Sequence, residues 1–272
     1  MPKSDKPRRE FDSSVTRVAP VFSKLEHRTD AWLAKLLDLA ASGIGRSDRP
    51  WANDDLAPQR VDFAHESSEM GHVKKKERAL DPPRSLLVWL VENVQNPDAR
   101  QLSVSPEVAK RRQKILERDP STTAEALQAL KRNDRAGAWS RFEGPTYPDV
   151  VIETNDALVV IEGKRTEPKA TTRTTWMPIR HQMLRHLDAA WEIRGNRDVF
   201  GMFIVEAEPE VDVAAVPEKW IAAARQTTSP TALDESLPHR SAAERADIAA
   251  AFVGVSTWQI VCAEFGIQID LS

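Results

Sequence analysis

The sequence predicts an α/β protein with a central mixed β-sheet flanked by helices, preceded by a helical N-terminal extension. Short runs rich in β-branched residues, such as DVVIET and ALVVIEG, are bounded by Gly, Pro and Asn-Asp and predict strands. Helical patterns alternate with such runs after about residue 139, which is typical of a sheet covered on both faces. The 272 residues are 41% hydrophobic and 29% charged, as expected for a globular protein.

Residues 1–80 are expected to form the extension, made of helix and loop and without a predicted role. Residues 1–28 are polar and expected to be loosely ordered. Thr29 or Asp30 can cap a helix that runs to about residue 41 and carries an apolar face. Residues 47–80 are polar and rich in turn-forming residues, so we expect a loop with at most a short helix.

Residues 81–272 are expected to form the second unit, which begins with three helices. The first starts at the Asp-Pro-Pro of 81–83, and the second runs from Ser105 to about residue 118. Thr122 and Glu125 are spaced as a capping box for the third, which ends near residue 132.

The strands are expected after these helices. The runs 139–144, 149–154 and 157–163 are predicted to form three strands. A helix over about 178–193 and a strand from Val199 follow. Further helices open at Pro217 and Ser241, and a last strand over 253–258 precedes a terminal helix.

Composition excludes several classes of protein. No apolar run approaches the roughly 20 residues that span a bilayer, and the N-terminus lacks the apolar stretch of a secretory signal. The single cysteine, Cys262, excludes a disulfide framework and a Cys-rich zinc site, so a cytoplasmic protein without a membrane partner is expected. Residues 206–272 hold 4 Lys/Arg against 11 Asp/Glu. The rest of the chain is therefore basic, which suits a polyanion on one face but also fits an unevenly charged, solvated surface.

Asn155-Asp156 lies between two apolar runs and is expected to form a tight hairpin turn. A two-residue turn, or a four-residue loop with the same centre, places Asp149 directly opposite Glu162. Opposed side chains in an antiparallel pair have Cβ atoms about 4.5–5.5 Å apart. Two carboxylates that close together repel, and a bound Mg²⁺ would convert this repulsion into coordination.

Lys164 lies two residues beyond Glu162, so strand alternation places it on the same face. Gly163 between them leaves a sterically open carbonyl that could be another metal ligand. Such a metal would polarise a scissile phosphate and lower the pKa of a bound water, while Lys164 would orient or deprotonate that water or offset developing negative charge. The alternative is a solvated, charged strand edge.

With Pro148-Asp149, a twelve-residue interval and Glu162-Gly163-Lys164, the chain resembles the PD-(D/E)XK nuclease superfamily, the restriction-endonuclease-like proteins. The resemblance extends from about Trp139 to Glu206. It implies a core of helix, three-stranded meander, helix and a further strand. It also implies an endonuclease that hydrolyses nucleic acid, with DNA as the expected substrate and Mg²⁺ (or Mn²⁺ in its place) held by Asp149 and Glu162.

The resemblance also draws attention to supporting residues. Family members often carry a glutamate on the helix before the first core strand, and Glu92 fits as a third metal ligand. Glu143 could take that role instead, or hold the loop before Asp149. Gln182 is expected to face the site from the following helix as a catalytic residue. The candidate nucleic-acid contacts are Arg111, Arg112, Trp176, Arg180 and Arg185.

For each of these residues, an ordinary place on a solvated helix face is the alternative. His181 and His186 are five residues apart, which does not suit a helical metal pair, so a structural or solvent-exposed position is expected. Two rival functions are a catalytically inactive binding or structural protein on the same fold, and an interaction protein whose hairpin charges are accidental. A homodimer would suit cleavage of both strands of a duplex.

Overall fold

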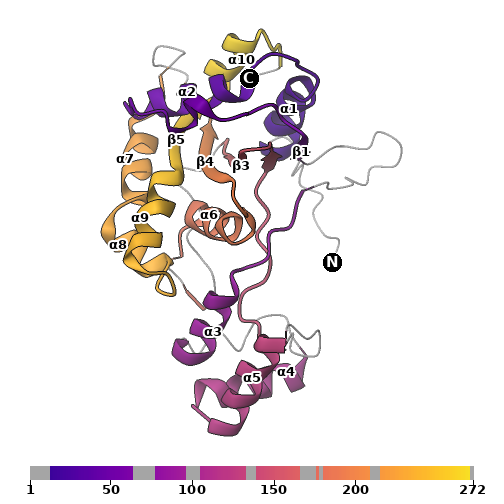
Figure 1. Cartoon of the computed structure of the whole chain (residues 1–272), viewed down its shortest axis with the longest axis vertical. Coiled ribbons are helices and arrows are strands. Elements are labelled where there is room, and N and C mark those ends of the chain that lie inside the picture. The colour runs from indigo at the N-terminus through magenta and orange to yellow at the C-terminus, as the bar shows by residue number, and fades with distance from the viewer. Residues whose placement is uncertain are drawn as a thin grey trace, which may run out of the picture.

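The computed structural model describes residues 13–63, 77–95, 105–132, 139–165, 176–177, 180–208 and 215–269. Its centre is a five-stranded mixed sheet in the order β1-β2-β3-β4-β5 (Figure 1). The strands are β1 (Arg60–Phe63), β2 (Val150–Glu153), β3 (Ala157–Gly163), β4 (Asp198–Val205) and β5 (Phe252–Thr257). β1, β2 and β3 form an antiparallel meander, and β4 and β5 continue the sheet parallel to β3.

One face of the sheet is covered by helices from both ends of the chain. These are α1 (Ala19–Leu25), preceded by the π-helical turn η1 (Ser14–Val18), then α2 (Trp32–Gly43) and α10 (Trp258–Phe265). Their apolar residues share a buried cluster with alternate residues of the strands, among them Val150, Val159 and Ile161. Since successive side chains of a strand point to opposite faces, the intervening residues serve the other face.

On this face, two glycines allow helix α2 and strand β5 to approach each other closely. A Cβ on Gly43 would lie 1.9 Å from the backbone oxygen of Val255, and a Cβ on Gly254 would lie 2.3 Å from that of Ala40. Gly254 also has a φ of +149°, which side-chain-bearing residues rarely adopt. Helix α2 therefore packs against β5 almost backbone to backbone.

The opposite face is covered by α6 (Gln182–Ile193), α7 (Glu218–Thr227), α8 (Pro230–Ser236) and α9 (Ala242–Ala251). Their apolar residues pack with the other strand positions, including Val151, Val160 and Phe203. Glu162 and Lys164 share this parity, so they point toward the layer that contains α6. The two clusters make a three-layer α/β/α arrangement, which confirms the expected mixed sheet flanked by helices.

A helical lobe lies beyond one end of the sheet and contains α3 (Arg84–Asn93), α4 (Pro106–Leu116) and α5 (Pro120–Arg132) (Figure 1). It has its own buried cluster, in which Leu90 and Ile115 pack with Trp139 and Phe142. The segments that enter and leave the lobe pair through an isolated antiparallel bridge between Leu80 and Thr146.

The N-terminal part of the chain differs from expectation. β1 and the 3-10 turn η2 (Pro50–Asn53) lie in a stretch expected to be mostly loop, and Ser14–Leu25 is helical. β1 pairs with β2, and α1 and α2 help to build the sheet's core, so the boundary expected near residue 80 does not coincide with a break in the α/β unit.

Of the remaining predicted strands and helix starts, some were confirmed and others were wrong. The strand expected over 139–144 is not formed, because Trp139 and Phe142 pack into the helical lobe instead. Asp119 rather than a Thr122–Glu125 box caps α5, since its carboxylate accepts the backbone N–H of Thr122 at 2.8 Å. β2 to β5 lie within about one residue of their predicted bounds. The Ser105 cap of α4 and the helix that opens at Ser241 are also confirmed.

The helix predicted over 178–193 is observed from Gln182, while residues 178–179 lie outside the described part of the chain. Among the described helices, none has both the length and the apolar character needed to cross a membrane.

Candidate active site

The hairpin register places Asp149 opposite Glu162, as predicted, and these two residues are called the acid pair below. Val150 pairs with Ile161 and Glu153 with Leu158, which is the register expected from a turn at Asn155-Asp156. Asp149 and Glu162 are the next opposed positions beyond the ladder. The backbone N–H of Gly163 donates to Asp149 Oδ2 at 2.8 Å, so the Asp149 carboxylate is held against the end of β3.

Asp149 has an environment that disfavours its charge. Burial, followed by the nearby charge of Glu162, raises the pKa of this carboxyl to about 7. Hydrogen bonds from the Ser14 hydroxyl (2.8 Å to Oδ1) and the Gly163 N–H act in the opposite direction, but they are outweighed. Without a cation, Asp149 is therefore only partly ionised at neutral pH.

Glu162 is buried, and neighbouring side chains contact both of its carboxylate oxygens. Its Oε1 contacts Lys164 Nζ at 2.9 Å and accepts from Gln182 Nε2 at 2.7 Å, while its Oε2 lies 3.0 Å from His186 Nε2. Burial acts to raise the pKa of Glu162, but the hydrogen bond and charge of His186, together with Lys164, lower it below the usual value. Two adjacent acids thus have opposite pKa shifts, a pattern found where carboxylates take different chemical roles.

His186 was expected to be structural or solvent-exposed, and of these two positions the structure shows the buried, structural one. His186 is buried beside Glu162, and its Nδ1 lies 2.7 Å from the Thr146 hydroxyl. Gln182 and His186 are four residues apart on α6, so both side chains lie on one helix face and reach the same carboxylate. That spacing was the signal available in the sequence, because Gln182 was already placed at the site.

Two residues of the N-terminal segment also reach the site, although no role was predicted for residues 1–80. The Ser14 hydroxyl contacts Asp149, and the Ser13 hydroxyl donates to the carbonyl oxygen of Gly163 at 3.1 Å. These contacts join positions 135 and 150 residues apart in sequence. No motif in the sequence pairs these serines with the hairpin.

The donor set suits a hard divalent cation such as Mg²⁺. Mg²⁺ is commonly bound through one or two carboxylates and completes its coordination with water and substrate oxygens. Asp149 and Glu162 offer two carboxylates on one face, and Gly163, next to Glu162 at the end of β3, offers a backbone carbonyl that accepts a hydrogen bond from the Ser13 hydroxyl. Within the described residues, no group of three or more His, Cys, Asp or Glu could hold a metal, so an ion here would complete its coordination with oxygens such as the Gly163 carbonyl, water or substrate.

Glu92 and Glu143 lie away from the acid pair's hydrogen-bond network. Glu92 is exposed near the end of α3 in the helical lobe. The helical segment that does reach the site from before the first strand is η1, which brings Ser14 rather than a glutamate. Glu143 is buried and accepts from Trp176 Nε1 at 3.0 Å and from Arg185 Nε at 2.8 Å. Of its two predicted roles, holding the loop before Asp149 agrees with these contacts.

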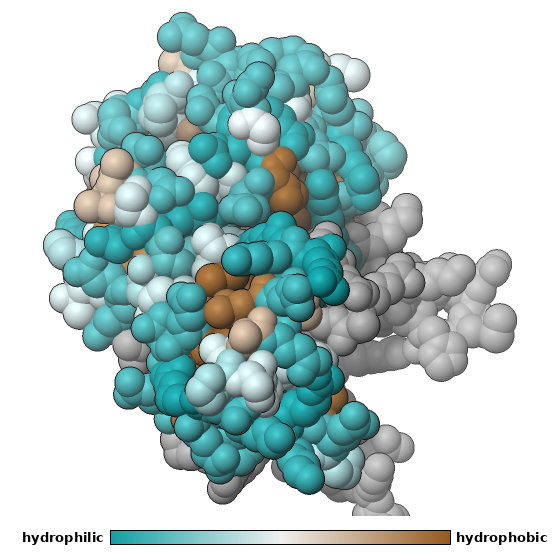
Figure 2. Space-filling model, turned by 60° about the horizontal axis from the view of Figure 1, so that its bottom comes forward, coloured by the Kyte–Doolittle hydropathy of each residue, from teal (hydrophilic) through white to brown (hydrophobic). Residues whose placement is uncertain are grey.

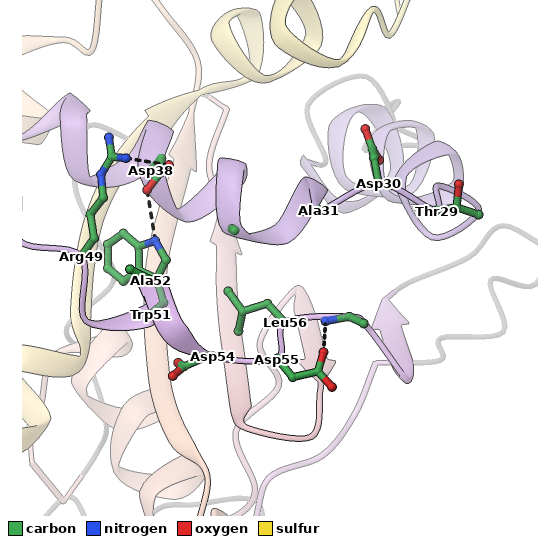
Figure 3. Close-up of a pocket in the computed structure, with 12 residues that line it drawn as sticks. Thr29, Asp30, Ala31, Asp38, Arg49, Trp51, Ala52, Asp54, Asp55 and Leu56 are labelled. Carbon is green, nitrogen blue, oxygen red and sulfur yellow. Dashed lines mark hydrogen bonds and ion pairs between the residues drawn. The ribbon is translucent and has the colours of Figure 1, made fainter.

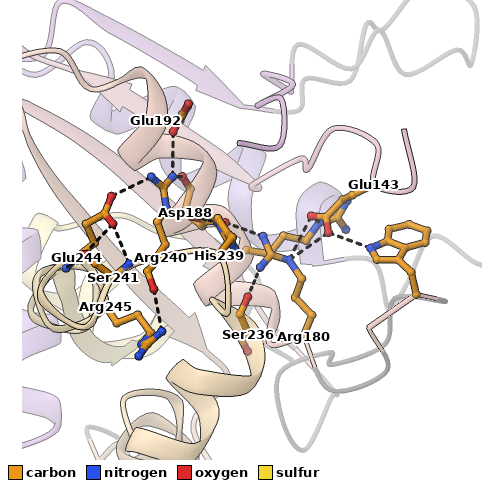
Figure 4. A network of polar contacts seen from close by, with 12 residues as sticks. Glu143, Arg180, Asp188, Glu192, Ser236, His239, Arg240, Ser241, Glu244 and Arg245 are labelled. Carbon is orange, nitrogen blue, oxygen red and sulfur yellow. Dashed lines mark hydrogen bonds and ion pairs between the residues drawn. The ribbon is translucent and has the colours of Figure 1, made fainter. Parts of the chain in front are cut away.

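Arg180 is part of a buried polar network and does not face solvent (Figure 4). It forms ion pairs with Glu143 at 3.1 Å and with Asp188 at 2.8 Å. Asp188 in turn binds His239 and Arg240. Burial alone would raise the pKa of Asp188, but the hydrogen bond from His239 and the charges of the arginines lower it to about 2. The network ties α6 to the α8–α9 turn and corrects the prediction of Arg180 as a phosphate contact.

The other candidate nucleic-acid contacts have varied positions. Arg112 is buried and donates to the carbonyls of Trp139 and Arg141, so its predicted phosphate contact is also corrected. Arg111 is partly exposed, stacks 3.8 Å above the Trp139 ring and pairs with Glu125. Arg185 and Trp176 are partly exposed beside Glu143, so, like Arg111, they remain predictions.

A separate pocket in the described part of the chain has a lining that does not suit nucleic acid. A pocket of about 580 Å³ lies between α2 and residues 49–57, lined by Asp30, Asp38, Asp54 and Asp55 together with Arg49 (Figure 3). Its acidic lining would repel a polyanion. The face seen in Figure 2 is mostly hydrophilic, with small apolar areas separated by polar residues.

Comparisons with protein-family models, with curated proteins and with solved structures found no match to this chain.

Proposed function

We propose that the chain is a metal-dependent nuclease of the PD-(D/E)XK type, which hydrolyses phosphodiester bonds of nucleic acid, with DNA as the expected substrate. The observation that carries this proposal is the hairpin contact between Gly163 N–H and Asp149 Oδ2, 2.8 Å. It fixes Asp149 beside Glu162, while Lys164 Nζ lies 2.9 Å from Glu162 Oε1. A hairpin selected only for stability would not place two acids together in an apolar setting.

The order of elements also supports the proposal. The resemblance implies a helix, a three-stranded meander, a helix and a further strand. The chain has α1 and α2, then the β1-β2-β3 meander with the helical lobe α3–α5 inserted between β1 and β2, then α6 and β4. The acid pair and Lys164 lie at the carboxyl end of β3, which runs parallel to β4, and ligands of open α/β sheets commonly bind outside such strand ends.

Each side chain of the site would have its own role in hydrolysis. Asp149 and Glu162 would hold the cation, and Gln182 and His186 orient the Glu162 carboxylate. Lys164 donates its N–H groups to the attacking water or to a phosphate oxygen that gains charge in the transition state. A divalent ion at this position would supply polarisation of the scissile phosphate and help the water to ionise.

A catalytically inactive protein on the same fold is the second candidate. Lys164, Gln182 and His186 supply donors to both oxygens of Glu162, so this carboxylate has protein partners whether or not an ion binds. In that case the lysine would serve as a permanent counter-ion. The two candidates differ in whether removal of Lys164 affects hydrolysis or only stability.

The test is incubation of the full chain with labelled single- and double-stranded DNA and RNA, in Mg²⁺, Mn²⁺ or EDTA. We expect metal-dependent cleavage that falls by about 10²- to 10⁴-fold in Lys164→Ala, the usual contribution of a proton-transfer group. Asp149→Ala should be equally inactive. Lys219→Ala is the matched control, because this lysine, on α7, forms an exposed ion pair with Glu208. Cleavage that survives in both Asp149→Ala and Lys164→Ala, or no cleavage of any substrate by folded wild type, contradicts the proposal.

A further inference from the structure

The N-terminal segment, residues 13–18, makes direct contact with two of the oxygen-bearing groups of the candidate metal site. The Ser14 hydroxyl donates to Asp149 Oδ1 at 2.8 Å, and the Ser13 hydroxyl donates to the Gly163 carbonyl oxygen at 3.1 Å. Because the Gly163 N–H already holds Asp149 Oδ2, each oxygen of this carboxylate has one donor from the protein. Each oxygen therefore keeps lone-pair capacity directed elsewhere, and the carboxylate cannot rotate without breaking a hydrogen bond.

The segment itself is fixed to the sheet next to the site. The Arg17 guanidinium is buried and pairs with Glu206, just beyond β4, at 2.8 Å. Val18 is fully buried, and its Cγ2 would lie 2.9 Å from a Cβ on Gly163. Gly163 thus lets the segment lie directly against the end of β3. A Cβ there would also lie 2.8 Å from Cζ2 of Trp258 on α10, so a larger residue would displace Val18, Trp258 or both.

The backbone of the segment is unusual as well. Ser14–Val18 forms a π-helical turn immediately before α1. Such turns are rare, and they occur frequently at functional sites. Here the π-helical turn begins at the residue that contacts Asp149.

Resting on the proposed function, we infer that Ser14 is a positioning residue of the metal site, which orients Asp149 for the cation. Hydrogen-bond partners that hold a ligating carboxylate fix its orientation, and their loss typically lowers metal affinity by about 10- to 100-fold. The N-terminal segment is then part of the site, and a site built from residues 81–272 alone lacks one donor to its first ligand.

The test is isothermal titration of Mn²⁺ into the full-length chain. Ser14→Thr keeps the hydroxyl, and Ser14→Val has the same shape without it, so the pair isolates the hydrogen bond. We expect Ser14→Thr to bind Mn²⁺ nearly as wild type does and Ser14→Val to bind about 10- to 100-fold more weakly. Ser23→Ala is the matched control, because the Ser23 hydroxyl on α1 bonds only to its own helix, at Pro20 O.

The outcomes separate this inference from the function on which it rests. If wild type binds no Mn²⁺, or if Asp149→Ala binds as wild type does, the metal site fails and the inference falls with it. If wild type binds and Asp149→Ala does not, but Ser14→Val equals Ser14→Thr, only the role of Ser14 is overturned. Tighter binding by Ser14→Val would overturn it too, because the hydroxyl would then compete with the ion.

Discussion

Asp149 and Glu162 lie across one hairpin, yet their surroundings shift the two pKa values in opposite directions. Glu162 has Lys164 and His186 as cationic or hydrogen-bonding partners. Among the described residues, the groups that favour a charged Asp149 are the Ser14 hydroxyl, a backbone N–H and, to a smaller extent, the charge of Lys164. Burial and the Glu162 charge therefore prevail at Asp149. In a protein without metal, one acid of the pair is charged and the other is partly protonated.

This asymmetry predicts how stability depends on pH. The pKa of Asp149 is raised from 3.8 to about 7 on folding, so the folded chain binds more protons than the unfolded chain between these values. Stability contributed by protonated Asp149 is therefore complete below about pH 4 and is lost as the pH rises through 7. We expect Asp149→Asn to be more stable than wild type by about 1–3 kcal/mol at pH 8, within the roughly 4 kcal/mol that three pKa units represent. Near pH 4 this advantage should vanish.

Urea unfolding in EDTA at pH 4.5, 6 and 8 measures this effect. Asp247→Asn is a suitable control, because Asp247 is exposed on α9. A stability difference between Asp149→Asn and wild type that does not change with pH would show that the buried carboxyl is ionised throughout.

The sequence was sufficient to predict the relative positions of Asp149, Glu162 and Lys164, because strand alternation and a two-residue turn fix the register within one hairpin. It was not sufficient for Ser14, which reaches Asp149 from 135 residues away. His186 was missed for a different reason. In the sequence, His186 was considered only together with His181, and their five-residue spacing does not suit a helical metal pair. Gln182 lies four residues before His186, so it was the residue that could have indicated a shared helix face.

At the scale of elements, the packing of α2 on β5 depends on two glycines. A Cβ on Gly43 would overlap the Val255 carbonyl oxygen at 1.9 Å, and backbone cannot move aside as a flexible side chain can. We expect Gly43→Ala to lower the free energy of unfolding by at least about 2 kcal/mol, as overpacking of a rigid contact does. Thermal or urea unfolding measures the change.

Gly144 provides the control for this prediction, since a Cβ there would have no neighbour within 4 Å. Gly144→Ala should stay within about 0.5 kcal/mol of wild type, as surface substitutions usually do. Equal stabilities of the two variants would mean that α2 can move away from β5 at little cost.

Elements with strong local signals were predicted well, and those decided by tertiary contacts were not. β3 and β4 are apolar runs between turn signals, so their bounds followed from pattern. β1 is a four-residue edge strand that contains the charged residues Arg60 and Asp62, so its sequence pattern did not indicate a strand. The run 139–144 has the composition of a strand, but its aromatic residues are used by the helical lobe.

At the scale of the whole molecule, the helical lobe and the sheet have separate cores. Ile115 is completely buried within the lobe's cluster, which contains no residue of the five strands. Each part can therefore be weakened on its own, although the Leu80–Thr146 bridge and the Glu143 contacts join them.

This separation predicts selective opening of the lobe. Ile115→Ala should cost the lobe about 2–5 kcal/mol, the usual range for a buried large-to-alanine change. Hydrogen exchange should become faster in α3, α4 and α5 and stay nearly unchanged in β3 and β4. Gln128→Ala, on the exposed side of α5, is the control. Equal acceleration in the central strands would show that the molecule opens as a single cooperative unit.

The bridge between Leu80 and Thr146 also has an evolutionary consequence. Directly paired residues of antiparallel strands have Cα atoms only about 4.5–5.5 Å apart, so the chain leaves the α/β unit and returns to it at nearly the same point. Residues 81–145 therefore have the topology of an inserted cassette. Insertions, deletions or exchanges within such a cassette would leave unchanged the connections of the strands that carry Asp149, Glu162 and Lys164.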